Sequence, residues 1–213
     1  MKSKNMKFAY FIGLTAAAVA AYARWVRPWH LRWGATPEEA DRPLPGDDLI
    51  PQPAMSATHA ITIHAPVSQV WPWIAQIGQG RGGFYSYDWL ENLFGMDIHN
   101  TGDLNPEWQN PKVGDTIPFW KGVGIPILQI ELPYLMVLGG SFAPQQPSGG
   151  SWTFLLESPD PQTTRLIVRA RVAGFSPQSL SLILYRFFME PAHFIMERGM
   201  LLGIKSRTER SRS

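Results

Sequence analysis

The chain has 213 residues, of which 45% are hydrophobic and 17% charged, enough for one globular domain with a sizeable core and an appendage. Residues 1–33 hold six of the nineteen Lys and Arg and no acid. Residues 34–213 therefore carry thirteen basic and seventeen acidic residues, a formal net charge of −4. A mildly acidic body argues against nucleic acid as a partner. The chain has no cysteine, which excludes disulfides, thiol nucleophiles, iron–sulfur clusters and cysteine-ligated zinc.

The N-terminal segment is predicted to attach the protein to a membrane. Residues 8–23 carry no charge, and as a helix they would be about 24 Å long, short of a hydrocarbon core of about 30 Å. Continuing the helix over residues 8–26, with Arg24 reaching the headgroups, would close the gap. Tryptophans suited to the membrane interface follow at four-residue intervals: Trp25, Trp29 and Trp33.

We therefore expect a single N-terminal membrane span, with its side undetermined because basic residues flank both ends equally. Two alternatives stay open: export after signal cleavage near Ala23, and a helix that docks on the body.

Residues 34–57 are predicted to be a Pro-rich tether. They hold five prolines with acids clustered between them, and proline fixes φ and removes a backbone donor. We expect an extended segment with a turn at Pro45-Gly46 that does not pack on the body. The predicted organisation is an anchor in residues 1–33, a tether in 34–57 and a folded domain in 58–213.

Apolar periodicity predicts the elements of that domain in chain order. A strand at residues 58–63 leads to a helix that begins at Pro66, runs to Ile77 and bends at Pro72. A second short helix is expected at residues 87–94. Five apolar runs between Gly/Pro turns are predicted strands: residues 116–120, 125–132, 134–142, 151–157 and 163–172.

The last of these strands shows the clearest alternation. Arg165, Arg169 and Arg171 alternate with Leu166 and the apolar residues that follow it, so one face is polar and the other apolar. This pattern is typical of an antiparallel sheet that is covered on one side.

Residues 176–205 are predicted to form the helix that covers the sheet, kinked or split at Pro191. The expected packing stripe is apolar: Leu184, Phe188, Pro191, Ile195 and Leu202. The opposite stripe, expected to face water, is polar: Arg186, Glu190, His193 and Glu197. The predicted fold class is thus α+β, with an antiparallel sheet wrapped around a long C-terminal helix.

A glycine-aromatic block, residues 76–92, points to a binding pocket. Four glycines in six positions indicate a backbone path that side chains would obstruct, and the aromatics after them are typical of a pocket wall. The glycines also match G-x-G-x-x-G, but a helix, not a strand, is predicted before them, which argues against a dinucleotide site. The candidate ligand-binding residues are Arg81, Tyr85, Tyr87 and Asp88 from this block, with Trp152 and Phe188.

Each candidate also has an ordinary structural interpretation. Arg81 could meet a ligand carboxylate or phosphate, or form a salt bridge with Asp88 or Glu91. The two tyrosines could donate to a ligand carbonyl, or simply pack in the core. His193 and Glu197, at i and i+4, could form an acid–base pair, although a solvated stripe is favoured. Three polar residues of one loop are interpreted as turn residues rather than metal ligands: Asp97, His99 and Asp103. His59 and His64 should face opposite sides of the first strand. No metal site and no cofactor are expected.

Several segments of the chain resemble the START-like, or SRPBCC, superfamily of helix-grip domains, within a bacterial branch that is largely uncharacterised. They lie at residues 32–49, 60–95, 113–119, 164–171 and 196–209, and include VGDTIPF, TRLIVRAR and MERGMLLGIKSRTE. The resemblance implies a sheet and a C-terminal helix that enclose a cavity for lipids, polyketides or other hydrophobic ligands. It carries over no catalytic residue.

Three functional hypotheses follow. The leading one is a membrane-tethered domain that binds a hydrophobic small molecule or lipid in its central cavity. The second is a cyclase or dehydratase acting on a hydrophobic carbonyl substrate, with Arg81, Tyr85 and a nearby carboxylate. The third is an interaction module whose cavity is filled by side chains such as Trp73. The sequence leans toward binding rather than catalysis.

Overall fold

The computed structural model describes residues 2–93, 95–120, 122–141, 149–174 and 180–210. The N-terminal helical elements are α1 (Lys2–Ala21), the π turn η1 (Tyr22–Val26), α2 (Arg27–Leu31), α3 (Pro37–Asp41) and the 3₁₀ turn η2 (Asp47–Leu49). The body then has β1 (Met55–Ile63), α4 (Val67–Ala75), α5 (Asp88–Leu93), the 3₁₀ turn η3 (Pro106–Trp108), β2 (Thr116–Trp120), β3 (Val123–Glu131), β4 (Leu135–Ser141), β5 (Gly149–Asp160) and β6 (Thr163–Val172). The C-terminal elements are α6 (Leu180–Leu184), the π turn η4 (Tyr185–Met189) and α7 (Glu190–Arg210).

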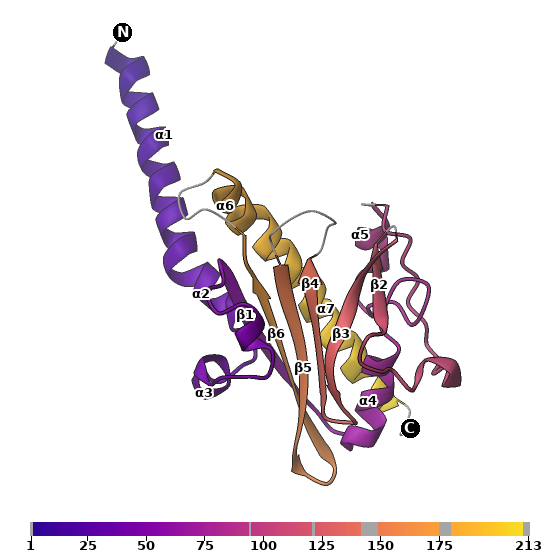
Figure 1. The fold of residues 1–213 in the computed structure, drawn as a ribbon. Coiled ribbons are helices and arrows are strands. Elements are labelled where there is room, and N and C mark those ends of the chain that lie inside the picture. The colour runs from indigo at the N-terminus through magenta and orange to yellow at the C-terminus, as the bar shows by residue number, and fades with distance from the viewer. Residues whose placement is uncertain (1, 94, 121, 142–148, 175–179, 211–213) are drawn as a thin grey trace.

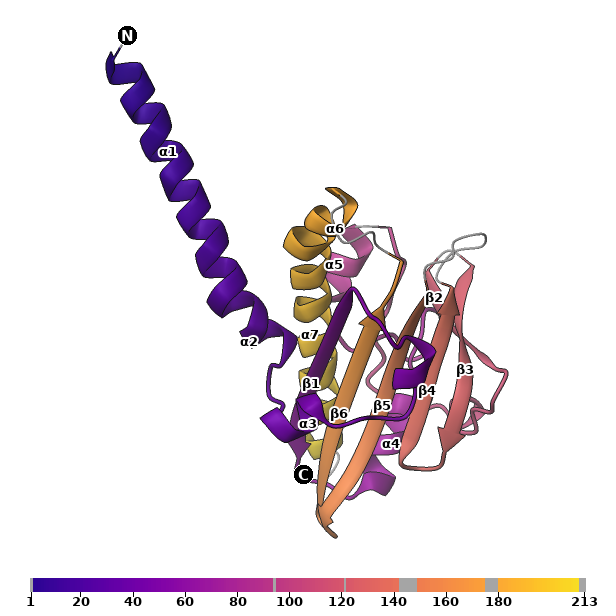
Figure 2. The same cartoon turned by 60° about the vertical axis from the view of Figure 1, so that its left-hand side comes forward.

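The six strands form one antiparallel sheet in the order β1-β6-β5-β4-β3-β2. The long C-terminal helix crosses one face of this sheet, and α4 lies beside it (Figures 1 and 2). Fully buried apolar side chains from the strands, α4 and α7 form the main core between them, including Phe154, Ile74 and Leu201. The predicted α+β fold, a sheet gripping a C-terminal helix, is confirmed.

The strand predictions were close because apolar runs and Gly/Pro turns mark strands well. The first and last of the five predicted runs are observed with the predicted bounds, as β2 and β6. The predicted helix that bends at Pro72 is α4, with Pro66 as its N-cap. The other strands differ at their ends; β1, for example, already begins at Met55.

Two π turns interrupt the helices, and each lies just before a proline. Because proline has no N–H and its ring clashes with the carbonyl four residues earlier, an α-helix must change its bonding there. Glu190 donates its N–H to the carbonyl of Tyr185 before Pro191, and Arg27 donates to the carbonyl of Tyr22 before Pro28. The interruption predicted at Pro191 is therefore a π turn within a helix that continues.

The orientation of the C-terminal helix is opposite to the prediction. The stripe expected to pack is exposed over most of its length, with Phe188 at 67%, Leu184 at 49% and Ile195 at 45%. The stripe expected to face water is turned inward, and both Glu190 and Glu197 are buried. Partners far away in the sequence make this burial possible, and a helical pattern does not reveal them.

The prediction that residues 34–57 form an extended, unpacked tether is wrong. The segment includes α3, closed by a capping box at Thr36, and runs across the outer face of the sheet, where Leu44 is buried. Arg169 in β6 is 3% exposed and donates to the carbonyls of residues 39, 40 and 42 and to the Asp47 carboxylate. The polar face of β6 is thus covered, because its arginines bind backbone carbonyls and acids of this segment.

Helix α1 projects away from the body toward the end where α6 lies (Figures 1 and 2). In the part of the chain that the structure describes, no helix combines the length and the apolar character that crossing a bilayer requires. The predicted transmembrane span is therefore not supported.

Candidate functional site

Glu197 lies at the centre of a buried polar cluster between α7 and the inner face of the sheet. Its carboxylate forms a hydrogen bond with His59 Nδ1 from β1, and both side chains are 1% exposed. The indole N–H of Trp152 from β5 donates to the other carboxylate oxygen at 2.6 Å. Each oxygen of a buried charge therefore has a partner, as burial of a carboxylate demands.

The proton positions follow from the partners of His59. Its Nε2 lies 2.7 Å from the backbone carbonyl of His30, which can only accept, so this nitrogen carries a proton. Burial by itself lowers the pKa of His59, but the Glu197 carboxylate and the His30 carbonyl outweigh it, and the net pKa is raised. Burial likewise acts to raise the pKa of Glu197, but the nearby histidines and the Trp152 N–H lower it overall. The raised pKa of His59 and the lowered pKa of Glu197 both favour an imidazolium hydrogen-bonded to a carboxylate.

His193 is the member of the cluster that is accessible from outside. It lies one helical turn before Glu197, its Nε2 is 3.6 Å from the carboxylate, and 30% of its side chain is exposed. Burial lowers its pKa against the opposing charge of Glu197, so it is neutral at pH 7. A neutral imidazole beside a fixed carboxylate can exchange a proton or a hydrogen bond with a bound molecule.

A second ion pair joins α2 to the start of α7. Arg27 forms two hydrogen bonds with Glu190, at 2.7 and 2.9 Å, and the Glu190 side chain is fully buried. Both residues follow directly after a π turn. Since the N–H of Glu190 is diverted to Tyr185, the carbonyl of Arg186 is left without its helical donor, and the Tyr22 hydroxyl donates to it at 2.9 Å.

His30 completes this junction in its neutral form. The proton of the Tyr22 hydroxyl is used on Arg186, so His30 Nε2, 3.2 Å away, donates to the tyrosine oxygen. His30 is 2% exposed, and its Nδ1 has no hydrogen-bond partner among the described residues. A second proton on that nitrogen would be buried and unpaired; burial, aided by the charge of Arg27, accordingly lowers the pKa of His30 to about 4.

Helix α2 therefore packs on the body instead of remaining free. Trp29 lies edge-on against Phe194 of α7, with ring centroids 5.3 Å apart. The Arg198 guanidinium lies 5.0 Å from the ring centroid of Trp33. Of the three tryptophans expected at a membrane interface, Trp25 and Trp29 remain largely exposed, at 67% and 58%.

The structure brings one predicted ligand-binding residue, Trp152, into the polar cluster. Its ring also contacts the aromatic part of the glycine-rich block, with Phe84 at 6.2 Å between centroids. Phe188 instead points outward from η4. Asp88 is exposed, and its carboxylate accepts from the N–H of Trp89.

Tyr85 and Tyr87 lie against α7 because two glycines allow the loop to approach. A Cβ on Gly203 would collide with the backbone carbonyl of Tyr85, and one on Gly199 would lie 2.9 Å from the Tyr87 ring. Tyr85 is 3% exposed and has a positive φ of 57°. The Arg207 guanidinium lies 4.8 Å from the ring centroid of Tyr85. Burial raises the pKa of the Tyr85 hydroxyl to about 12. Tyr85 is thus a core residue, whereas Tyr87 is half-buried.

Arg81 binds backbone carbonyls and holds the end of α4. Its Nη2 donates to the carbonyls of Ala75, the last residue of α4, and Trp108, at 2.9 and 3.3 Å. The predicted salt bridge with Asp88 or Glu91 is not what holds it. Because Arg81 caps α4, it does not converge with Tyr85 and a carboxylate on one reacting centre.

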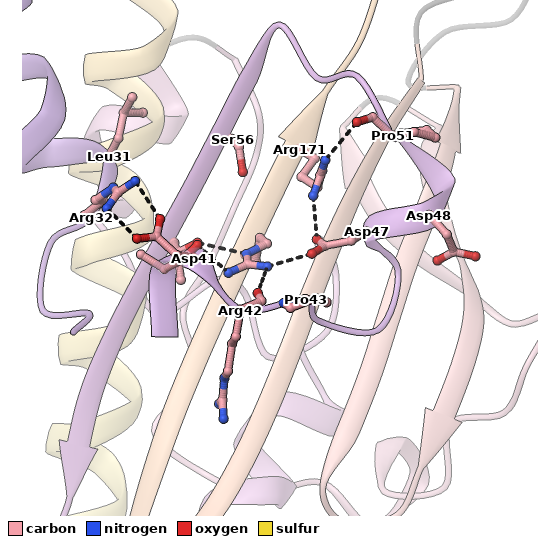
Figure 3. A pocket seen from close by; sticks show the side chains of 13 residues that line it. Leu31, Arg32, Asp41, Arg42, Pro43, Asp47, Asp48, Pro51, Ser56 and Arg171 are labelled. Carbon is pink, nitrogen blue, oxygen red and sulfur yellow. Dashed lines mark hydrogen bonds and ion pairs between the residues drawn. The ribbon is translucent and has the colours of Figure 1, made fainter. Parts of the chain in front are cut away.

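A pocket on the outer face of the sheet is lined by the segment that covers β6 (Figure 3). Its arginines are already paired: Arg169 and Arg171 with Asp47, and Arg32 with Asp41. The ion pairs explain how the N-terminal segment is held and leave little charge for a ligand.

Within the described ranges, no group of three or more His, Asp or Glu side chains is arranged to hold a metal ion. His99 and Asp97 form an exposed pair at 3.2 Å, while the backbone carbonyl of Asp103 accepts from Gln76. His59 points inward, and the backbone N–H of His64 donates to Glu209.

The most important site residues that sequence reasoning missed are Glu197 and His59. The sequence did contain weak indications of both residues. Glu197 and His193 had the spacing of a pair, and His59 occupied an apolar strand face between Ala57 and Ile61. A histidine at an inward position of a strand needs a partner, and an inward carboxylate on the covering helix would have supplied it.

No family model and no curated protein matches the sequence. Solved structures do match the fold. A hypothetical protein from Helicobacter pylori aligns at 11% identity with a TM-score of 0.51, over 78% of this chain and 95% of that one. Norcoclaurine synthase of Thalictrum flavum aligns at 10% identity with a TM-score of 0.44, over 75% of this chain and 96% of that one. The Zhui aromatase/cyclase of Streptomyces sp. R1128 aligns at 13% identity with a TM-score of 0.37, over 75% of this chain and 96% of that one.

At these identities the likeness concerns the fold alone. The sheet order, the long C-terminal helix and the position of α4 define the helix-grip class. The chain therefore has an α+β helix-grip fold, which the Helicobacter pylori protein shares.

Proposed function

We propose that the protein binds a hydrophobic small molecule or lipid between the inner face of the sheet and the C-terminal helix, near a membrane to which residues 8–26 attach it. The observation that carries this proposal is the inward-turned polar stripe of α7. His193 lies on this stripe and is still 30% exposed beside a fully buried ion pair. An inward polar side chain that keeps an accessible edge is suited to orient a ligand.

The surroundings of His193 support an apolar ligand with one polar group. Aromatic rings line the sheet side, with Trp152 packed between Phe84 and Phe154 at centroid distances of 6.2 and 4.7 Å. A neutral imidazole has one donor and one acceptor nitrogen, so the exposed edge of His193 can form a hydrogen bond with a ligand hydroxyl. The apolar body of the ligand would lie against the rings and its polar end against the imidazole.

The first test is native mass spectrometry, with organic extraction, of the full chain released from membranes in mild detergent. We expect an apolar molecule to accompany the wild type and the control His99→Leu, whose side chain is 81% exposed in a loop. His193→Leu should lower the occupancy severalfold. A folded wild-type protein that carries no apolar molecule would contradict the proposal.

A second function, a cyclase or dehydratase acting on a hydrophobic carbonyl substrate, has one observation in its favour. His193 is neutral and next to an ionised carboxylate, as a general base requires. Arg81 and Tyr85 have no part in this version, because one caps a helix and the other is buried in the core. Conversion of the extracted molecule on incubation with wild type, and its absence with His193→Leu, would establish catalysis.

A further inference from the structure

Large apolar side chains are exposed together at one end of the molecule, which we call the apolar end. On α6 and η4 they recur at i, i+3, i+4, i+7 and i+8 and are 36% to 69% exposed: Leu180, Ile183, Leu184, Phe187 and Phe188. Trp89 and Leu93 of α5 are 67% and 72% exposed. Both α5 and α6 lie at the end of the sheet toward which α1 projects (Figures 1 and 2). An exposed apolar cluster of this kind marks a contact surface.

The charge of the apolar end indicates what covers it. Residues 173–189 contain one basic residue, Arg186, and no acid, while α5 carries the exposed Asp88 and the buried Glu91. The N-terminal helical segment, which projects from the body in the direction of this end, has no acid before Glu38 and carries basic residues at both ends of its apolar run. Exposed Trp25 and Trp29 lie where this segment meets the body. The last turns of α7, by contrast, bear charged residues: Lys205, Arg207, Glu209 and Arg210.

We propose that the apolar end docks into the surface of an anionic bilayer, with α6 and η4 as a shallowly inserted amphipathic helix and α5 as a second contact. An apolar helix face bounded by basic residues and tryptophans matches the apolar and anionic layers of a membrane surface. This docking accounts for the reversed orientation of the C-terminal helix. The polar side chains of the helix form ion pairs and hydrogen bonds in the interior, and the apolar stripe remains on the surface, where it can contact lipid.

The inference deepens the proposed function and rests on its membrane attachment, because it identifies which surface of the grip faces the lipid. Docking would place the α6 end of the grip against the phase in which hydrophobic ligands dissolve. It does not require that α1 cross the bilayer.

The absence of cysteine allows a local test in the full chain. Phe188→Cys and the control Val113→Cys, which precedes β2 and is 59% exposed, are each labelled with the environment-sensitive dye NBD. Vesicles of phosphatidylcholine with 30% phosphatidylglycerol are added, with and without spin-labelled lipid. We expect the dye at position 188 to shift to the blue and be quenched by spin-labelled lipid, and the dye at 113 to stay in water.

Substitution tests the same surface without a dye. Phe188→Asp should weaken vesicle partitioning by about tenfold or more, since a buried Phe contributes on that scale. Val113→Asp should leave partitioning unchanged. If the dye at 188 stays in water while the protein sediments with vesicles, attachment runs through α1 alone and the inference is overturned. A blue shift at 188 that grows with protein concentration in the absence of vesicles would overturn it in favour of a second copy. Failure of ligand extraction, in contrast, would affect the proposed ligand and not this surface.

Discussion

Acidification from pH 7 to pH 5 should weaken the fold in part through His30. Its pKa is about 4 in the folded protein against 6.5 for an unperturbed histidine. Because the folded-state pKa is depressed, the unfolded chain takes up the proton first; this contribution to stability is complete above pH 6.5 and is lost as the pH falls toward 4. The linkage relation gives a loss of about 2 kcal/mol between pH 7 and pH 5.

The matched variant is His30→Gln, whose side-chain amide can still donate to the Tyr22 oxygen but does not titrate. Urea unfolding followed by far-ultraviolet circular dichroism gives the free energy of unfolding of both proteins at the two pH values. We expect wild type to lose about 2 kcal/mol more than the variant, and His99→Gln, altered in an exposed loop, to behave like wild type. An equal loss in wild type and His30→Gln would show that protonation of His30 does not cause the loss of stability.

Substitutions at Glu197, Arg27 and Gly203, with one at Arg32 for comparison, test the packing under the C-terminal helix by the same unfolding measurement. Glu197→Ala should destabilise the protein by about 3–5 kcal/mol, because it leaves a buried histidine and indole without a partner. Glu197→Gln should cost clearly less, because its amide can still pair with both groups; equal losses would contradict this reason and show that the charge itself is required. Arg27→Ala should cost about 3 kcal/mol since Glu190 is fully buried, whereas Arg32→Ala, in an exposed pair, should cost under about 1 kcal/mol. Gly203→Ala should destabilise by about 1–3 kcal/mol through its collision with the loop at Tyr85; a neutral effect would show that the loop yields.

The sheet could be predicted from the sequence because each strand is a local apolar run that ends at a turn. The bounds of β2 and β6 are those predicted, and Pro66 marks the start of α4. These features depend on residues that are close together in the chain, which a single sequence displays.

The orientation of the C-terminal helix could not be predicted in the same way. Helical periodicity separates two stripes but does not say which one packs when each has partners elsewhere. Glu197 is matched by His59 and Glu190 by Arg27, and both partners lie more than a hundred residues away in the sequence. The covering of β6 by residues 34–57 escaped prediction for the same reason, because Arg169 binds backbone carbonyls that have no signature in the sequence.

The candidate site was predicted in part. The glycine-aromatic block does lie against the C-terminal helix, and Trp152 does face inward. Arg81 and Phe188 illustrate the limits: an arginine in a glycine-rich loop is as well used by helix-end carbonyls as by a ligand, and an apolar helix residue can face outward.

Binding between the sheet and the C-terminal helix can be observed by nuclear magnetic resonance of the histidine and tryptophan side chains during addition of a lipid extract from the expression host. We predict that the His193 and Trp152 signals shift with the added extract while the signal of His99 does not. Shifts confined to the exposed indoles of Trp25 and Trp29, with His193 and Trp152 unchanged, would contradict binding between the sheet and the C-terminal helix.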